Sequence, residues 1–187
     1  MNIERMKQPF GSAVIEPGSE WVKLLYNRSA DCVIAQFLRV SEQQIPASDL
    51  YFRKASDADY VRVRSDPGRS YDDPVSCGRK PYVFFNMVQW GEASTGGDWV
   101  CLARLSLPHG AVTPLVDRTK LKLPDGCARG WIASILDVDD QGTVATCRLA
   151  FEVSTGLERS RVEYSIRDLD LATGEHDLLV NLPGIFV

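Results

Sequence analysis

RVEYSIRDLDLATGEHDLLVNL, at residues 161–182, is the stretch that decides the fold. Residues 162–171 and 176–182 are rich in apolar and β-branched side chains, and the turn-forming sequence ATGE separates them. Two such segments joined by a short glycine-containing turn predict a β-hairpin. Fainter versions of this hairpin occur upstream, as DWVCLARLSLPHGAVTPLV at 98–116 and DLYFRKASDADYVRVRS at 49–65. Three copies of one hairpin predict a repeat protein.

A turn that contains proline and glycine recurs along the chain and marks the repeat boundaries. The prolines of this turn are Pro17, Pro67, Pro124 and Pro183. Successive prolines lie about 50 to 60 residues apart, which suits radial β-repeats with some lengthened loops. The four turns therefore bound three units, at about residues 19–66, 72–117 and 127–182.

Each unit contains four strand-like segments separated by turn residues. The predicted strands are 20–26, 32–40, 49–55, 59–65, 74–77, 82–90, 99–107, 112–116, 128–137, 143–153, 162–171 and 176–182. No long window carries apolar residues at helical spacing. We therefore expect residues 1–187 to form a single all-β domain of antiparallel strands.

The apolar pattern changes from the early to the late strands of a unit. YVFFNMV at 82–88 and WIASIL at 131–136 are apolar on both faces, which is typical of strands covered on both sides. Later strands alternate, and Pro114 lies in a last strand, where a missing N–H is tolerated at a sheet edge. Each unit is therefore expected to run from a buried inner strand to an exposed outer one.

Residues 162–171 change the face that carries their apolar side chains. Val162, Tyr164 and Ile166 share one face, whereas Leu169 and Leu171 lie on the other. A one-residue slip in a strand moves its side chains to the opposite face. We therefore predict a β-bulge in this strand, near Arg167 and Asp168.

Four antiparallel strands that run from inside to outside form a blade of a β-propeller. WIASILDVDDQGTVA at 131–145, followed by DLDLATGE at 168–175, resembles a blade of the TolB-type, WD-like β-propellers. The resemblance is strongest over residues 126–182, although no Ser-Pro-Asp-Gly turn is literally present. It implies an architecture and no chemistry, because that family includes periplasmic binding proteins, peptidase gating domains and some lyases.

Closed propellers have about four to eight blades, whereas this chain has three blade-like units. Two copies could complete a six-bladed ring by two-fold symmetry. The chain could instead be part of a longer propeller, or its strands could form a β-sandwich. The final NLPGIFV resembles a linker and the beginning of another inner strand. The expected fold is thus a half or partial β-propeller, with a β-sandwich as the alternative.

Charge and hydropathy argue against two classes of protein, nucleic-acid-binding proteins and membrane proteins. The chain of 187 residues has a net charge of −4, which argues against a general nucleic-acid-binding protein. No apolar run has the length of a signal peptide or a membrane span, so a cytoplasmic protein without a membrane partner is expected.

Neither a metal nor a cofactor is expected. The five cysteines show no C-x-x-C spacing and are expected to be buried as small apolar residues. DVDDQG at 137–142 superficially resembles a calcium loop. It lacks the acidic fifth position, and Arg148 replaces the glutamate needed at the twelfth, so we predict a hairpin turn there.

No catalytic residue is predicted, because the chain lacks the common nucleophile, P-loop and zinc-protease motifs. His109 and His176 fall in or beside turns and are expected to be exposed there. In a propeller, the loops after the outer strands and between the second and third strands gather on one rim, and such loops carry binding residues. The candidate ligand-binding residues are Tyr71, Asp72, Asp73, Trp90, Arg118, Lys120 and Arg129.

The leading hypothesis is a non-catalytic binding module that recognises a protein or small ligand at its loop rim and is completed by homodimerisation. One alternative is a small hydrolase or lyase, or a fragment of one, in which Asp72, Asp73 and His109 converge. Another is a structural protein whose open sheet edges pair with neighbours. Fold alone does not choose among them.

Overall fold

The computed structural model describes residues 20–40, 46–63, 69–89, 99–154, 160–183 and 185–186, and these contain strands and turns but no helix. The first sheet contains β1 (Glu20–Asn27), β2 (Cys32–Val40), β3 (Pro46–Lys54) and β4 (Val61–Arg62). The second contains β5 (Arg69–Ser76), β6 (Tyr82–Gln89), β7 (Trp99–Ser106) and β8 (Ala111–Asp117). The third contains β9 (Cys127–Val138), β10 (Val144–Ser154), β11 (Ser160–Asp170) and β12 (His176–Asn181), with the short β13 (Ile185–Phe186) beside β11.

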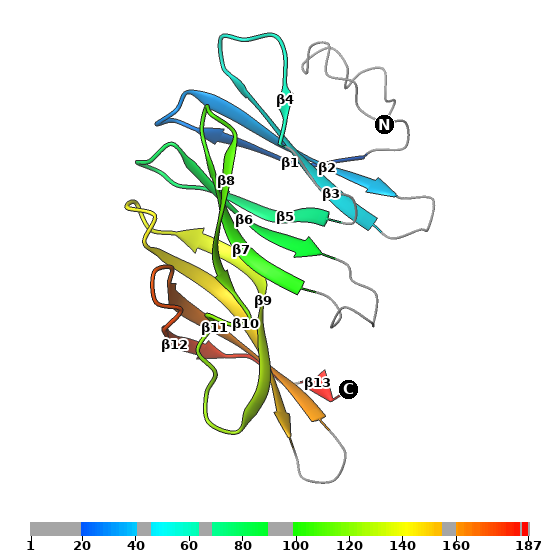
Figure 1. Ribbon diagram of the computed structural model, residues 1–187, viewed down its shortest axis with the longest axis vertical. Helices are drawn as coiled ribbons and strands as arrows, with labels where there is room; N and C mark the ends of the chain where they lie inside the picture. Colours follow the sequence, from blue (N-terminus) through cyan, green and yellow to red (C-terminus); the bar gives the residue numbers. More distant parts are fainter. Residues whose placement is uncertain are drawn as a thin grey trace.

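The all-β class and the three units of four antiparallel strands are confirmed. Within each unit of four strands, every strand pairs with the next strand in the sequence, as the hairpin repeats predicted. Figure 1 shows the three sheets following one another along the long axis of the molecule. Closure of these sheets into a propeller stays a prediction.

The sheets pack face to face through two apolar cores. The core between the first and second sheets includes Ile34, Leu50, Phe52, Tyr71 and Phe85. The core between the second and third sheets includes Phe84, Leu102, Ile132, Leu149 and Phe151. The second sheet is therefore covered on both faces, because successive side chains of a strand point to opposite sides. This double coverage explains the unbroken apolar run in β6.

The side chain of Asn27 joins the first sheet to the second. It is fully buried at the end of β1, and its Oδ1 accepts a hydrogen bond from the Ala30 N–H at 2.8 Å. Its Nδ2 lies within 3.0–3.1 Å of four oxygens on the β5–β6 hairpin, namely Ser76 Oγ and the carbonyls of Cys77, Lys80 and Tyr82. One buried amide thus connects the two turns, and its two N–H bonds are shared among these acceptors.

A second contact joins the β5–β6 hairpin to the third sheet. The Cys77 thiol lies 3.4 Å from the Asp139 carbonyl oxygen, and the Arg79 guanidinium forms an ion pair with Asp140 at 2.8 Å. The Asp139 carboxylate in turn accepts hydrogen bonds from the N–H groups of Thr143 and Val144. Residues 139–143 are therefore a hairpin turn, as predicted for the calcium-like sequence. The three turns follow one another on the same side of the molecule (Figure 1).

The bulge predicted in residues 162–171 lies in the neighbouring strand instead. The β10–β11 register is unbroken, so β11 contains no extra residue. The irregularity lies in the β11–β12 pairing, where Ile166 is opposite Val180 and Arg167 is opposite Leu178, which leaves Leu179 as the extra residue of β12. The apolar residues of the first half of β11 lie on the face away from the core, whereas Leu169 and Leu171 at its end face the core.

The end of the chain does not begin another inner strand. β13 pairs with β11, with Ile185 opposite Val162 and Phe186 opposite Arg161. The expectation from Pro114 is confirmed, because β8 is the outermost strand of the second sheet. The register of β7 and β8 also shifts next to Pro114, between Leu102 and Ala103.

The Asn27 contact yields a stability prediction. We expect Asn27→Leu to lower the free energy of unfolding by about 2–4 kcal/mol, because the Ala30 N–H and the buried Cys77 carbonyl lose their side-chain partner. Urea denaturation measures the change. The matched control is Ser29→Ala, which removes only the exposed hydrogen bond to the Arg79 carbonyl and should change the free energy by less than about 0.5 kcal/mol. Equal losses in the two variants would contradict the role given to Asn27.

Candidate functional site

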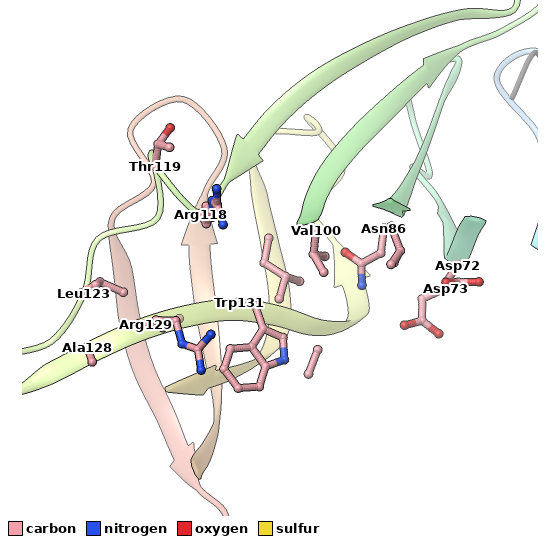
Figure 2. A pocket seen from close by; sticks show the side chains of 14 residues that line it. Asp72, Asp73, Asn86, Val100, Arg118, Thr119, Leu123, Ala128, Arg129 and Trp131 are labelled. Atoms are coloured by element: carbon pink, nitrogen blue, oxygen red, sulfur yellow. The ribbon is translucent and has the colours of Figure 1, made fainter. Parts of the chain in front are cut away.

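A pocket of about 900 Å³ lies between the second and third sheets (Figure 2). Its walls come from β5, β6, β7, the loop 118–126 and the beginning of β9. The lining residues are Asp72, Asp73, Asn86, Val88, Val100, Arg118, Thr119, Leu123, Ala128, Arg129, Gly130, Trp131, Ile132 and Ala133. The pocket lies at the end of the second sheet that is farther from the Cys77 turn.

An irregularity in β5 brings two neighbouring carboxylates to one pocket. Adjacent residues of a regular strand point to opposite faces, so Asp72 and Asp73 would normally be separated. The β5–β6 register shifts between Asp72 and Val75, and Asp73 has a φ of 51° in the left-handed region. Aspartate tolerates that region better than most residues, and Pro74 has no N–H to lose from the ladder. Both carboxylates therefore line the same pocket.

Burial raises the pKa of both carboxyl groups. For Asp72, the hydroxyls of Ser48 and Ser70 partly offset the effect, and the Ser70 hydroxyl donates to Asp72 Oδ1 at 2.9 Å. For Asp73, burial raises the pKa most and the charge of Asp72 adds to the rise. Lys23, Arg148 and a hydrogen bond from Asn86 act in the opposite direction on Asp73. The two charges are thus incompletely compensated by the protein.

Asn86 is the polar interruption in the apolar β6 strand. It lies opposite Asp72 in the β5–β6 ladder, and only 2% of it is exposed. Its side chain reaches the pocket (Figure 2) and hydrogen-bonds Asp73. Among the described residues, nothing donates a hydrogen bond to its buried Oδ1. A buried acceptor without a donor is costly, so this oxygen is available to a ligand.

Two arginines and a tryptophan form the rest of the pocket. Figure 2 shows Asp72 and Asp73 at one end, Arg118 and Arg129 toward the other, and the Trp131 ring between the two ends. The Arg129 guanidinium is exposed and forms an ion pair with Glu152 at 2.6 Å. Arg118 is exposed at the beginning of the loop 118–126. The acidic end is therefore the more buried one, and the basic end faces solvent.

Lys120 holds the loop 118–126 in place and does not line the pocket. Its ammonium group donates to the carbonyls of Leu115 at 2.9 Å and Leu171 at 3.0 Å. The Lys122 N–H donates to the Gly174 carbonyl, which ties the loop to the β11–β12 turn. Gly174 has a φ of 76°, and a Cβ there would collide with the Lys120 carbonyl oxygen, so only glycine fits.

The structure brings together four of the seven candidate residues, namely Asp72, Asp73, Arg118 and Arg129. Tyr71 is 2% exposed and packs edge-on against Phe85 in the first core, with 5.0 Å between ring centroids, and Lys120 supports the neighbouring loop. Trp90 lies outside the described residues. Asn86 and Trp131 were missed, although a lone polar residue within YVFFNMV was a usable signal for Asn86.

The residues of the hydrolase or lyase hypothesis do not meet. His109 is exposed in the β7–β8 turn and does not line the pocket that contains Asp72 and Asp73. His176, expected to be exposed, is partly buried instead, with Nε2 2.8 Å from the Lys122 carbonyl oxygen and Nδ1 3.1 Å from Arg167. The His176 ring therefore connects the third sheet to the loop 118–126.

The five cysteines are free thiols, and all except Cys127 are buried. The part of the chain that the structure describes holds no cluster of three or more histidine, cysteine, aspartate or glutamate residues arranged for a metal ion. It also has no helix able to span a membrane.

Comparison with known families finds no family model that matches this chain, and no curated protein is similar to it. The resemblance to TolB-type propellers therefore stays a prediction from the residues quoted above. The pocket has to be interpreted from its own geometry and chemistry.

The raised pKa of Asp73 predicts a pH-dependent stability. Because the folded-state pKa exceeds the unfolded value of 3.8, stability falls as pH rises from 3.8 through the folded pKa, and the cost persists at pH 7. We expect Asp73→Asn to raise the melting temperature at pH 7 by about 1–3 °C, and to have a smaller effect near pH 4. Asparagine also tolerates the left-handed backbone.

Thermal denaturation monitored by circular dichroism at both pH values tests this expectation. A lower melting temperature of Asp73→Asn at pH 7 would mean that attraction to Lys23 and Arg148 outweighs the cost of burial. Asp177→Asn, on the exposed face of β12, is the control and should leave the melting temperature within about 1 °C at either pH.

Proposed function

We propose that this chain is a non-catalytic binding module that takes a small ligand in the pocket between its second and third sheets. The observation that supports this proposal most is the convergence of side chains from distant segments. Asp72, Asn86, Arg118 and Trp131 come from four different elements and meet around one space. Rigid strands hold most of them, which limits the entropy lost when a ligand binds.

The energetics of the acidic end favour a binding role over a folding role. Buried carboxylates whose pKa is raised cost stability at neutral pH. The orphaned Oδ1 of Asn86 adds a further cost. Groups that destabilise the folded chain while facing a pocket are typical of binding sites. A ligand that pairs with them would recover the lost free energy.

We further propose that two copies associate, as expected for a half-propeller. Ile166 and Val180 are cross-strand partners on the face of the third sheet that points away from the second. On the first sheet, Leu24 and Tyr26 point away from the second sheet and are 48% and 54% exposed. Apolar side chains on the two outward faces support an arrangement in which each face of one copy covers the opposite face of the other.

The binding proposal is tested by a fragment screen read by NMR. The chain has four tryptophans, so Trp131→Phe assigns the Trp131 indole N–H signal by its disappearance. We expect fragments that bind to shift this signal and the Asn86 side-chain amide signals together. A broad screen of polar, charged and apolar fragments that moves none of these signals would overturn the proposal.

The association proposal is tested by light scattering after size exclusion over a range of concentrations. We expect twice the chain mass of 20.8 kDa for the wild type and a shift toward the chain mass for Val180→Glu. Asp125→Asn, in the loop 118–126 and exposed, should keep the wild-type mass. A wild type that is monomeric at all concentrations would overturn this proposal and leave the pocket proposal untouched.

A further inference from the structure

The acidic end of the pocket is lined mainly by hydrogen-bond acceptors, and the amide N–H group of Asn86 there is engaged by Asp73. Asp72 already accepts from the Ser70 hydroxyl, and Asp73 accepts from the Asn86 amide, so the amide oxygen of Asn86 is turned to the pocket without a donor. Figure 2 shows the three side chains side by side at this end. The chemical complement of two carboxylates and a carbonyl oxygen is a group that donates several hydrogen bonds and accepts none.

We propose that the Asp72–Asp73–Asn86 end of the pocket binds the primary ammonium group of a small organic amine. This inference rests on the proposed function and names the class of its ligand. An ammonium group has three donors and a full positive charge, so it can pair with the Asp73 carboxylate and donate to the Asn86 oxygen, while the charge of the neighbouring Asp72 adds attraction. Hydrogen bonds between charged groups are stronger than those between neutral groups, and more so where water is partly excluded.

The walls next to the acidic end favour an organic cation over a bare metal ion. Val88, Val100 and Ile132 line the pocket, and the Trp131 ring lies beside the same space (Figure 2). Apolar walls suit a hydrocarbon body, and an indole ring attracts a cation on its face. Lys23 and Arg148 are close enough to lower the pKa of Asp73, and their charges would repel a divalent ion more than a single ammonium group.

Arg118 and Arg129 stand toward the opposite end of the pocket, separated from the aspartates by Trp131 (Figure 2). The Glu152 carboxylate is paired with Arg129 there, so both signs of charge are present at that end. The ligand is therefore defined by its ammonium group and not by the charge of its tail.

The experiment compares three probes of equal chain length with the full chain at pH 7. Hexylamine carries the ammonium group, hexan-1-ol is neutral and hexanoate is anionic. Binding is followed by the NMR signals of the Asn86 amide and the Trp131 indole. We expect hexylamine to bind at least tenfold more tightly than hexan-1-ol, and Asp73→Asn to remove about tenfold of its affinity. Asp177→Asn should leave the affinity unchanged.

Other outcomes separate this inference from the proposed function. Equal binding of hexylamine and hexan-1-ol, or tighter binding of hexanoate, would overturn the ammonium site and keep a binding pocket. Calcium ions that shift the Asn86 signals while hexylamine does not would also overturn it, in favour of a metal site. If neither hexylamine nor any fragment of the broad screen shifts these NMR signals, both the ammonium site and the binding pocket are overturned. Asn86→Leu provides a second variant, in which hexylamine should lose affinity while hexan-1-ol does not.

Discussion

The contacts among three hairpin turns are the constraint on which the rest of the structure depends. Asn27 connects the first turn to the second, and Cys77 with Arg79 connects the second turn to the third. Sheets that pack only through apolar faces can slide, because the hydrophobic effect has no direction. Hydrogen bonds to specific backbone carbonyls do have direction, so these turns determine how the three sheets are aligned along their strands.

The position of the pocket follows from that alignment. The second and third sheets are held together at the turn end, and the pocket lies between them at the other end, beyond Leu102 and Phe84. Twisted sheets that touch at one end diverge toward the other. Apolar side chains do not fill this space completely. It receives instead the bulged carboxylates of β5, Asn86 of β6 and the residues at the beginning of β9.

The same logic accounts for the apolar residues that point away from the cores. On the outward face of the first sheet, Ala35, Phe37 and Tyr51 form a small buried cluster, whereas Tyr26 is 54% exposed. On the outward face of the third sheet, Val180 is 50% exposed. The second sheet has a neighbour on each side and its strands are apolar on both faces. The exposed apolar side chains of the first and third sheets are those that the proposed association with a second copy would cover.

The strands and their pairing could be predicted from the sequence because both depend on local patterns. Segments such as 32–40 were predicted with the bounds of β2, since alternation and turn residues act over a few positions. The bulge was assigned to the wrong strand because the change of face in β11 reflects what covers each face, and not a slip in register. Gly174 belongs to the predictable part, since its turn requires a positive φ.

Some residues of the candidate site could likewise be predicted from the sequence, and others could not. Its charged residues stood out in the sequence because Asp72, Asp73, Arg118 and Arg129 lie in or beside predicted loops. The sequence by itself thus determined an all-β chain of three four-stranded units and a set of polar candidates. Only the tertiary structure decided that Tyr71 is core, that Lys120 anchors a loop, and that Asn86 and Trp131 join the carboxylates in one pocket. The reason is physical: β-strand patterns are local, whereas a pocket depends on how separate sheets pack, and that packing brings together residues far apart in the chain.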